Sequence, residues 1–254
     1  MSHSFSQHAA TIQSHPIGSF EELPASLKIA DTGRLSCFYA PFDYINTDAR
    51  IVICGITPGL QQARIALQIA AKRLHAGSTQ LDALRAAKAT ASFAGSMRIN
   101  LIRMLDYCGI HEKLELSSCA ELFESKQALL HTTSALRYPI LVNGKNYSGS
   151  PSMLTTPLLR DQIETYLVPE VASINANALF VPLGEKVAKV LLELARRGII
   201  NEQQVLAGVP HPSGANAERI KFFLGEKDEK DLSDRTNPIV INKAKECLFQ
   251  KLGI

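Results

Sequence analysis

Two short loops of the chain contain residues that could do chemistry. One is the segment H-P-S-G at 211–214, in which the imidazole of His211 can donate or accept a proton near neutral pH. The other is the turn G-I-T-P-G at 55–59, in which the hydroxyl of Thr57 can hold a water molecule but cannot act as a base at neutral pH. Glycine and proline also occur in ordinary turns, so the loops need a structural context before they indicate a site.

Both loops directly follow segments that we predict to be strands. Ala49–Ile56 is a continuous β-branched run of the kind that a strand buried on both faces requires, and Gln204–Val209 precedes His211. Leu60–Leu74 is a predicted helix whose first N–H groups would face the same edge as the first loop. Because α/β proteins bind ligands at the carboxyl ends of their parallel strands, we expect both loops at one ligand-binding edge.

The remaining pattern predicts the fold class, which is α/β. Further strands are predicted at Gln127–Tyr138 and Ala178–Leu183, and helices alternate with the strands. This order predicts a three-layer α/β/α sandwich with a central four-stranded parallel sheet. The other predictions are helices at 80–88, 96–107, 157–166, 185–197, from 216 onward and at 243–252, an extended stretch at 34–42, a long loop or small hairpin at 138–156, and a short strand or arm at 239–241.

The composition is that of one globular domain with decorated ends. The chain has 254 residues, of which 46% are hydrophobic and 20% charged, so it can bury a sizeable core. Residues 1–20 are rich in Ser, His and Gln, a composition that cannot repay the entropy of ordering unless something docks on it. We therefore expect a flexible N-terminal tail at 1–20 and a single domain at 21–254.

The charge and the cysteines limit the partners and the compartment. The 27 Lys and Arg against 24 Asp and Glu give a net charge of only +3, so any contact with nucleic acid must be local. The five cysteines are odd in number and form no C-x-x-C pair, which argues against a disulfide framework and against a zinc or iron–sulfur site. Without a secretory signal or a long apolar run, the chain is expected in the cytoplasm and not in a membrane.

The motifs resemble those of the uracil-DNA glycosylase superfamily. The segment 55–60, G-I-T-P-G-L, resembles the first motif of the mismatch-specific uracil and thymine branch, which reads G-I-N-P-G-L. The segment 211–216 contains the second motif, H-P-S, and is similar to the single-strand-selective branch. The stretch 93–105 resembles one of the iron–sulfur branch, and 184–188 resembles the family's G-(K/R)-x-A helix start. The resemblance runs from about 49 to 224.

This resemblance implies an enzyme that hydrolyses the N-glycosidic bond of uracil or another altered base in DNA. It implies that His211 donates a hydrogen bond to O2 of the departing base and that Thr57 holds the attacking water. It implies that Phe93 stacks on the extruded base, although a core phenylalanine is an equal alternative, and that Ser213 binds a flanking phosphate, caps the next helix, or does both. It further implies base-binding residues at Gly55, Ile56, Pro58, Gly59 and Thr132, and DNA-binding residues at Gly214 and Asn216. No cofactor or metal is implied.

Two departures from the family pattern keep a second function open, and a third concerns the substrate. Thr57 stands where active branches carry Asp or Asn, and Thr132 or Thr133 stands where the family reads the uracil edge with an Asn. One hydroxyl cannot replace the paired donor and acceptor of an amide. Gly214 and Ala215 are small where classical members carry a bulky wedge, which favours single-stranded DNA or a base that is already unpaired. The alternative is a glycosylase-fold protein without turnover that binds a nucleobase, damaged DNA or a partner.

Overall fold

The computed structural model describes residues 4–16, 18 and 20–253. The chain forms two compact units, and each unit is assembled from separate stretches of sequence. Unit 1 contains the chain up to Ile45 together with Ile56–Ala94 and Thr132–Glu170. Unit 2 contains Asn46–Gly55, Gly95–His131 and the chain from Val171 onward. Among the described residues, no helix combines the length and the apolar character that a membrane span needs.

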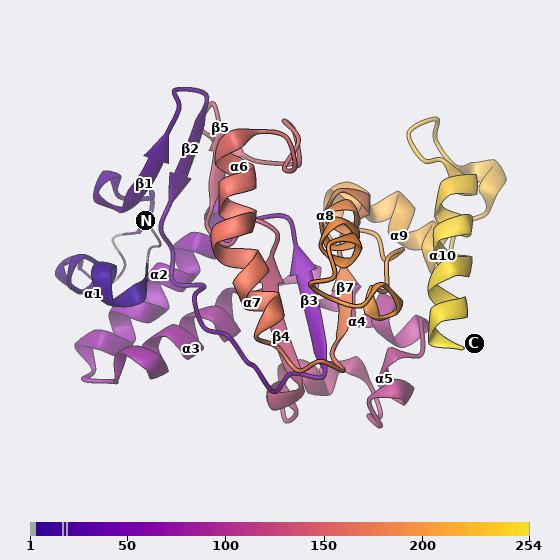
Figure 1. Cartoon of the computed structure of the whole chain (residues 1–254), viewed down its shortest axis with the longest axis horizontal. Coiled ribbons are helices and arrows are strands. Elements are labelled where there is room, and N and C mark those ends of the chain that lie inside the picture. Colours follow the sequence, from indigo (N-terminus) through magenta and orange to yellow (C-terminus); the bar gives the residue numbers. More distant parts are fainter. Residues whose placement is uncertain (1–3, 17, 19, 254) are drawn as a thin grey trace. The chain divides into compact units, whose positions relative to one another are not determined.

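The predicted parallel sheet is present with three strands, in the order β4-β3-β7. Strand β3 (Ile51–Gly55) is buried along its whole length and pairs in parallel with β7 (Leu179–Pro182), so that Ile51 lies opposite Leu179. Figure 1 shows these two strands side by side. Strand β4 (Leu130–Ser134) is shorter than predicted because a 3-10 turn occupies Gln127–Leu129. The α/β class is therefore confirmed.

The predicted fourth strand, Gln204–Val209, is not a strand in the described chain. Within residues 4–16, 18 and 20–253, a single parallel bridge, between Phe180 and Val205, continues the sheet beyond β7. A 3-10 turn at Glu202–Gln204 occupies the start of the segment, and Pro210, after its end, has no N–H to donate. Gly208 has a φ of 133°, outside the extended range, so the pairing ends after a single bridge.

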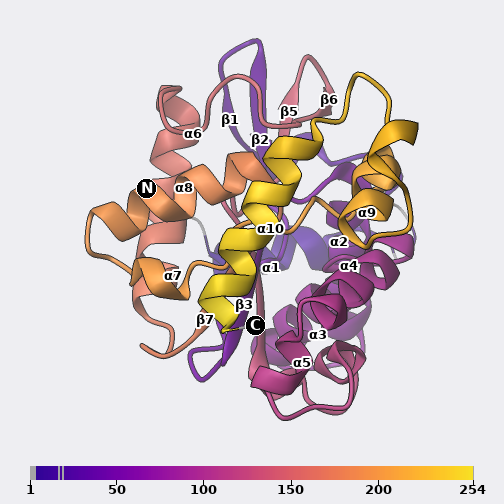
Figure 2. The same cartoon turned by 90° about the vertical axis from the view of Figure 1, so that its right-hand side faces the viewer.

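The helices of unit 2 cover much of its sequence. In α8 (Glu185–Arg196) the buried Val187, Leu191 and Leu194 follow the spacing of one helix face. Helix α10 (Pro238–Leu252), in the foreground of Figure 2, begins before the predicted residue because the Asn237 side chain accepts a hydrogen bond from the N–H of Val240. The prediction of a strand or arm at 239–241 is therefore wrong. The other helices are α4 (Ser96–Tyr107), α5 (Ile110–Lys113), α7 (Val168–Ala172), which begins in unit 1, and α9 (Ala217–Phe223).

Unit 1 contains an antiparallel sheet that we did not predict, in the order β1-β2-β5-β6. The extended stretch expected at 34–42 supplies β2 (Leu35–Phe38), which pairs with β1 (Lys28–Asp31) and with β5 (Ile140–Val142). The segment 138–156 contains a small hairpin, because Asn143 and Gly144 have positive φ angles and connect β5 to β6 (Lys145–Asn146). The helices are α1 (Phe5–Ser14), α2 (Leu60–His75), α3 (Gln80–Ala91) and α6 (Pro157–Gln162).

Helix α1 lies in the segment that we expected to be a tail. Its Phe5, Ala9 and Ile12 are buried and follow one another at helical spacing. The helix packs against α2 and α3, and the His8 ring stacks on Tyr39 with 4.0 Å between the ring centroids. Burial of this apolar stripe provides the stabilisation that offsets the entropy of ordering the segment.

Candidate functional site

The turn that contains Thr57 is held by hydrogen bonds within unit 1. The Thr57 hydroxyl donates to the carbonyl oxygen of Tyr138 at 2.9 Å and accepts from the N–H of Ile140 at 3.2 Å. The carbonyl oxygen of Ile56 accepts from the N–H of Leu136 at 2.9 Å. The single hydroxyl proton of Thr57 is therefore used, and one lone pair remains for a water molecule.

The first N–H groups of α2 are also occupied, by side chains of the same unit. The N–H of Gly59 donates to the Gln62 side chain at 2.9 Å, and the N–H of Leu60 donates to Oδ1 of Asn146 at 2.9 Å. A Cβ at Gly59 would lie 3.7 Å from the Asn146 amide, so the glycine lets this amide pack on the turn. We expected these N–H groups to approach a ligand, but Gln62 and Asn146 cap the helix start instead.

Thr132 is hydrogen-bonded to Ser92, the residue that ends α3 and precedes Phe93. The Thr132 hydroxyl donates to the Ser92 hydroxyl at 2.9 Å, and the N–H of Ser92 donates to the carbonyl oxygen of Lys88. Phe93 follows with a φ of 50°, a left-handed conformation that costs a bulky residue about 1–2 kcal/mol. Glycine is the usual residue at this position after a helix. The Phe93 side chain is 7% exposed, so the core alternative for this residue remains open.

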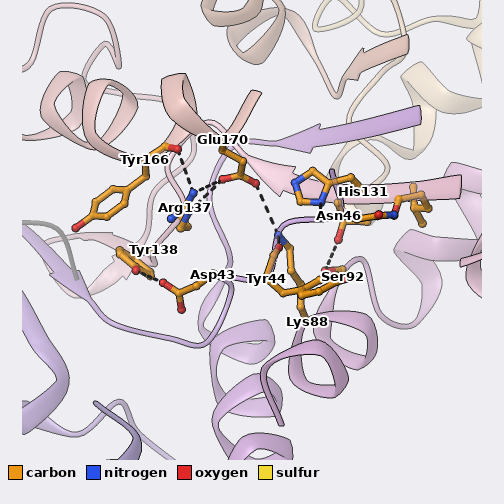
Figure 3. Close-up of polar contacts among 12 residues, drawn as sticks. Asp43, Tyr44, Asn46, Lys88, Ser92, His131, Arg137, Tyr138, Tyr166 and Glu170 are labelled. Carbon is orange, nitrogen blue, oxygen red and sulfur yellow. Dashed lines mark hydrogen bonds and ion pairs between the residues drawn. The ribbon is translucent and has the colours of Figure 1, made fainter. Parts of the chain in front are cut away.

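Unit 1 also contains a cluster of buried charges that the sequence analysis missed (Figure 3). Nη2 of Arg137 donates to Oε2 of Glu170 at 2.6 Å, and Nζ of Lys88 lies 3.7 Å from Oε1 of the same carboxylate. Nζ of Lys88 also donates to the carbonyl oxygen of Tyr44. Burial lowers the pKa of Lys88 to about 8, although the Glu170 carboxylate opposes this shift. Glu170 and Lys88 are only 1% and 4% exposed, so their charges depend on one another.

A second polar group of unit 1 consists of the Asp43 carboxylate and two tyrosines, Tyr39 and Tyr138. The hydroxyls of Tyr39 and Tyr138 both donate to the carboxylate of Asp43, the former at 2.6 Å. Burial raises the pKa of Asp43, and these two hydrogen bonds oppose the shift. Tyr138 thus binds Asp43 with its side chain and Thr57 with its carbonyl, while the preceding residue, Arg137, binds Glu170. The segment 137–138 therefore fixes the turn to the cluster.

The loop of His211 lies in unit 2, and its imidazole has a defined tautomer. Nδ1 of His211 accepts a hydrogen bond from the N–H of Ser213 at 3.3 Å, which places the proton of the neutral ring on Nε2. The side chain is half-buried, and this burial lowers the pKa of His211 from its ordinary value of 6.5. At neutral pH the ring is therefore uncharged, with one N–H that can serve as a donor.

Backbone contacts hold this loop in place. Nδ2 of Asn100 donates to the carbonyl oxygen of Pro212 at 3.0 Å, which anchors the loop to α4. The Ser213 hydroxyl accepts from Nδ2 of Asn216 at 3.1 Å and makes no side-chain cap to the following 3-10 turn, Gly214–Asn216. Its hydroxyl proton can therefore be donated to another acceptor. Gly214 and Ala215 are exposed.

Two glycines allow close backbone packing next to the same loop. Gly184 has a φ of 87°, its N–H donates to the carbonyl oxygen of Val209, and a Cβ there would lie 3.7 Å from Cβ of His211. A Cβ at Gly208 would lie only 2.7 Å from the carbonyl oxygen of Ala244 in α10. The segment before His211 is thus pressed against α10, and neither position accepts a side chain without strain.

The predicted site residues fall into two groups. The structure connects His211, Ser213 and Asn216 through one loop of unit 2, and it connects Thr132 to the residue before Phe93 in unit 1. The Thr57 hydroxyl is bound to Tyr138 and Ile140. The predicted site residues in unit 1 are Ile56, Thr57, Pro58, Gly59, Phe93 and Thr132. Those in unit 2 are Gly55, His211, Ser213, Gly214 and Asn216.

Comparisons with known proteins agree with the motifs. Residues 42–234 match the model of the uracil DNA glycosylase superfamily, which is more than half of the chain. The chain is 36% identical over 234 residues to the uncharacterized protein YoxB of Bacillus subtilis (strain 168), in a match that covers 87% of this chain and 91% of YoxB. No solved structure matches the chain. The protein therefore belongs to the uracil-DNA glycosylase superfamily.

Proposed function

We propose that the protein is a DNA glycosylase that hydrolyses the N-glycosidic bond of uracil or another altered base. Water adds to C1′ of the sugar as the bond from C1′ to the base breaks; the base leaves with the bonding electrons and ends with the proton that the water loses. The observation that carries the proposal is the tautomer of His211, whose Nδ1 is occupied by Ser213 and whose Nε2–H can be donated. Membership of the superfamily supports this class of reaction.

A neutral imidazole donor suits the charge that develops in this reaction. Negative charge accumulates on the leaving base, and a fixed N–H aimed at it stabilises the transition state more than the ground state. Since burial lowers the pKa of His211, the ring keeps this form at pH 7. The Ser213 hydroxyl proton, Gly214 and Asn216 provide local contacts for the flanking phosphate, in keeping with a net charge of only +3.

Thr57 has a supporting role in this proposal. Its hydroxyl proton is bound to Tyr138, so Thr57 offers the attacking water one lone pair and no base. A cation-like sugar is a strong electrophile, and water can attack it without a fully ionised base nearby. The small Gly214 and Ala215 favour single-stranded DNA.

The proposal also covers the architecture and the compartment. We propose that residues 21–254 form one three-layer α/β/α domain and that the protein acts in the cytoplasm.

The first experiment measures strand cleavage after alkali treatment of labelled oligonucleotides. Single-stranded and double-stranded substrates carry uracil, hypoxanthine or xanthine, and the enzymes are the wild type, His211→Ala and His111→Ala. We expect His211→Ala to lower the rate about 10²–10³-fold, the usual effect of removing one oxyanion donor. His111 is a partly buried histidine of the same unit, outside the loop, and its replacement should leave the rate unchanged. Absence of cleavage of every substrate by the wild type would overturn the proposal.

A second candidate function is binding without turnover. It is favoured by the hydroxyls of Thr57 and Thr132, which are donated to Tyr138 and Ser92 where the active branches carry Asp or Asn. Fluorescence anisotropy with the same oligonucleotides distinguishes the two functions. Tight binding of a uracil-containing strand that remains intact would support the binding protein, whereas binding followed by release of free uracil would exclude it.

A further inference from the structure

The conformation of Phe93 has no local explanation in the sequence. The residue follows Ser92, which ends α3, and adopts a left-handed φ of 50°. In this position a helix usually ends with glycine, because any Cβ clashes with the backbone. A strained bulky residue persists only where the surrounding structure enforces it, and such residues cluster at ligand-binding sites.

The structure shows what enforces this conformation. Ser92 is buried, and its hydroxyl accepts a hydrogen bond from the Thr132 hydroxyl of β4 at 2.9 Å. On the helix side, the N–H of Ser92 donates to the carbonyl oxygen of Lys88, whose own side chain is fixed by Glu170 and by the carbonyl oxygen of Tyr44. The residue before Phe93 is thus tied to a strand on one side and to the buried charges on the other (Figure 3).

We propose that Ser92 and Thr132 form a positioning pair that holds Phe93 in its left-handed conformation and presets its ring as a stacking surface for a nucleobase. This inference rests on the proposed function, because that function supplies the ligand. It gives Thr132 a different role from the one expected from the sequence, since the proton of its hydroxyl is donated to Ser92. The pair acts through Phe93 and not on the reacting atoms.

The test compares Thr132→Val with Thr132→Ser and with Thr133→Val. Valine has the shape of threonine without its hydroxyl, whereas serine keeps the hydroxyl. Thr133 is the next residue of β4, is 7% exposed and points to the opposite face of the strand, so Thr133→Val is a matched control for the proteolysis measurement and is not used for KM. We expect Thr132→Val to raise KM for a uracil-containing oligonucleotide about three- to tenfold, which corresponds to the loss of one hydrogen bond, with a smaller change in kcat. Thr132→Ser should restore KM to within about twofold of the wild type.

A second readout does not depend on activity. Chymotrypsin cleaves after Phe93 when the turn opens, so Thr132→Val should be cut there about three- to tenfold faster than the wild type under native conditions. Thr132→Ser and Thr133→Val should be cut at the wild-type rate. If the wild type cleaves no oligonucleotide, the proposed function fails, and this readout still decides the positioning of Phe93. Equal proteolysis of Thr132→Val and wild type, or no recovery in Thr132→Ser, would overturn the inference.

Discussion

The turn of Thr57 and the loop of His211 are held in place by different means. The Thr57 turn is fixed by its own hydroxyl and by a buried set of charges, so the hydroxyl proton and one lone pair of Thr57 are used within the structure. The His211 loop is fixed by backbone contacts with Gly184, Gly208 and Asn100, and only Nδ1 of its imidazole is occupied. A side chain remains available for chemistry where the backbone holds the loop, and this difference is why we propose His211, and not Thr57, as the main catalytic residue.

The largest expected effect comes from the charges that support the Thr57 turn. Glu170→Ala removes the carboxylate shared by Arg137 and Lys88 and leaves two buried cations without it. We expect the free energy of unfolding to fall by about 3–5 kcal/mol, as for a broken buried ion pair. Urea unfolding followed by circular dichroism measures the change.

The matched control breaks an exposed pair. Glu185 and Lys189 form a salt bridge on α8 with both side chains largely exposed, and Glu185→Ala should cost at most about 0.5 kcal/mol. If the two variants lose the same stability, the cluster does not support the turn in the way described, and the contrast between the two regions is lost.

The second effect concerns the contact that presses the His211 segment against α10. Gly208→Ala places a Cβ 2.7 Å from the Ala244 carbonyl oxygen and should lower stability by about 1–3 kcal/mol through overpacking alone. Gly198→Ala is the control, because Gly198 also has a positive φ, 73°, but no atom lies within 4 Å of its added Cβ. Thermal unfolding of both variants separates the effect of the contact from that of the backbone strain. An equal loss of stability in the two variants would mean that α10 shifts to accommodate the added Cβ.

The Thr57 turn and the strand before it could be predicted because their signals are local. The β-branched run before Gly55 and the Gly/Pro turn after it depend on neighbouring residues, and the parallel pair β3-β7 confirms the prediction. The failure at Gln204–Val209 has a long-range cause besides the local ones, since Gly208 also packs on a helix that begins only at Pro238. The apolar spacing of Phe5, Ala9 and Ile12 was present in the sequence, but the polar composition around it concealed α1.

The buried charges could not be predicted in the same way. Lys88, Arg137 and Glu170 are far apart in the sequence, and each residue type is ordinarily exposed. The one local signal is Lys88 itself, which lies between Ala87 and Ala91 on the buried face of α3. The capping of α2 by Asn146 is a further tertiary contact, and it occupies the N–H of Leu60, which the strand–turn–helix pattern offers to a ligand.

A smaller effect is expected from the Thr57 hydroxyl. Thr57→Val removes the hydrogen bonds to Tyr138 and Ile140, and the part-buried site should cost about 1 kcal/mol. Thr57→Ser keeps both bonds and should be close to the wild type in stability and in activity. Since the proposed reaction uses Thr57 only for its lone pair, the rate of Thr57→Val should fall much less than that of His211→Ala. A loss as large as that of His211→Ala would move the catalytic capacity back to the Thr57 turn.

The smallest effect is a pH dependence that belongs to the His211 loop. Burial lowers the pKa of the folded His211 below its ordinary value of 6.5, so the unfolded chain binds a proton that the native protein does not between the two values. The contribution of this histidine to stability is therefore complete above pH 6.5 and is lost as the pH falls through the folded pKa. His211→Asn cannot titrate, so subtracting its unfolding free energy from that of the wild type between pH 8 and pH 5 isolates the contribution. The difference should decline toward acid pH; a flat difference, or one that rises, would mean that the ring accepts its proton readily and is not held neutral in the fold.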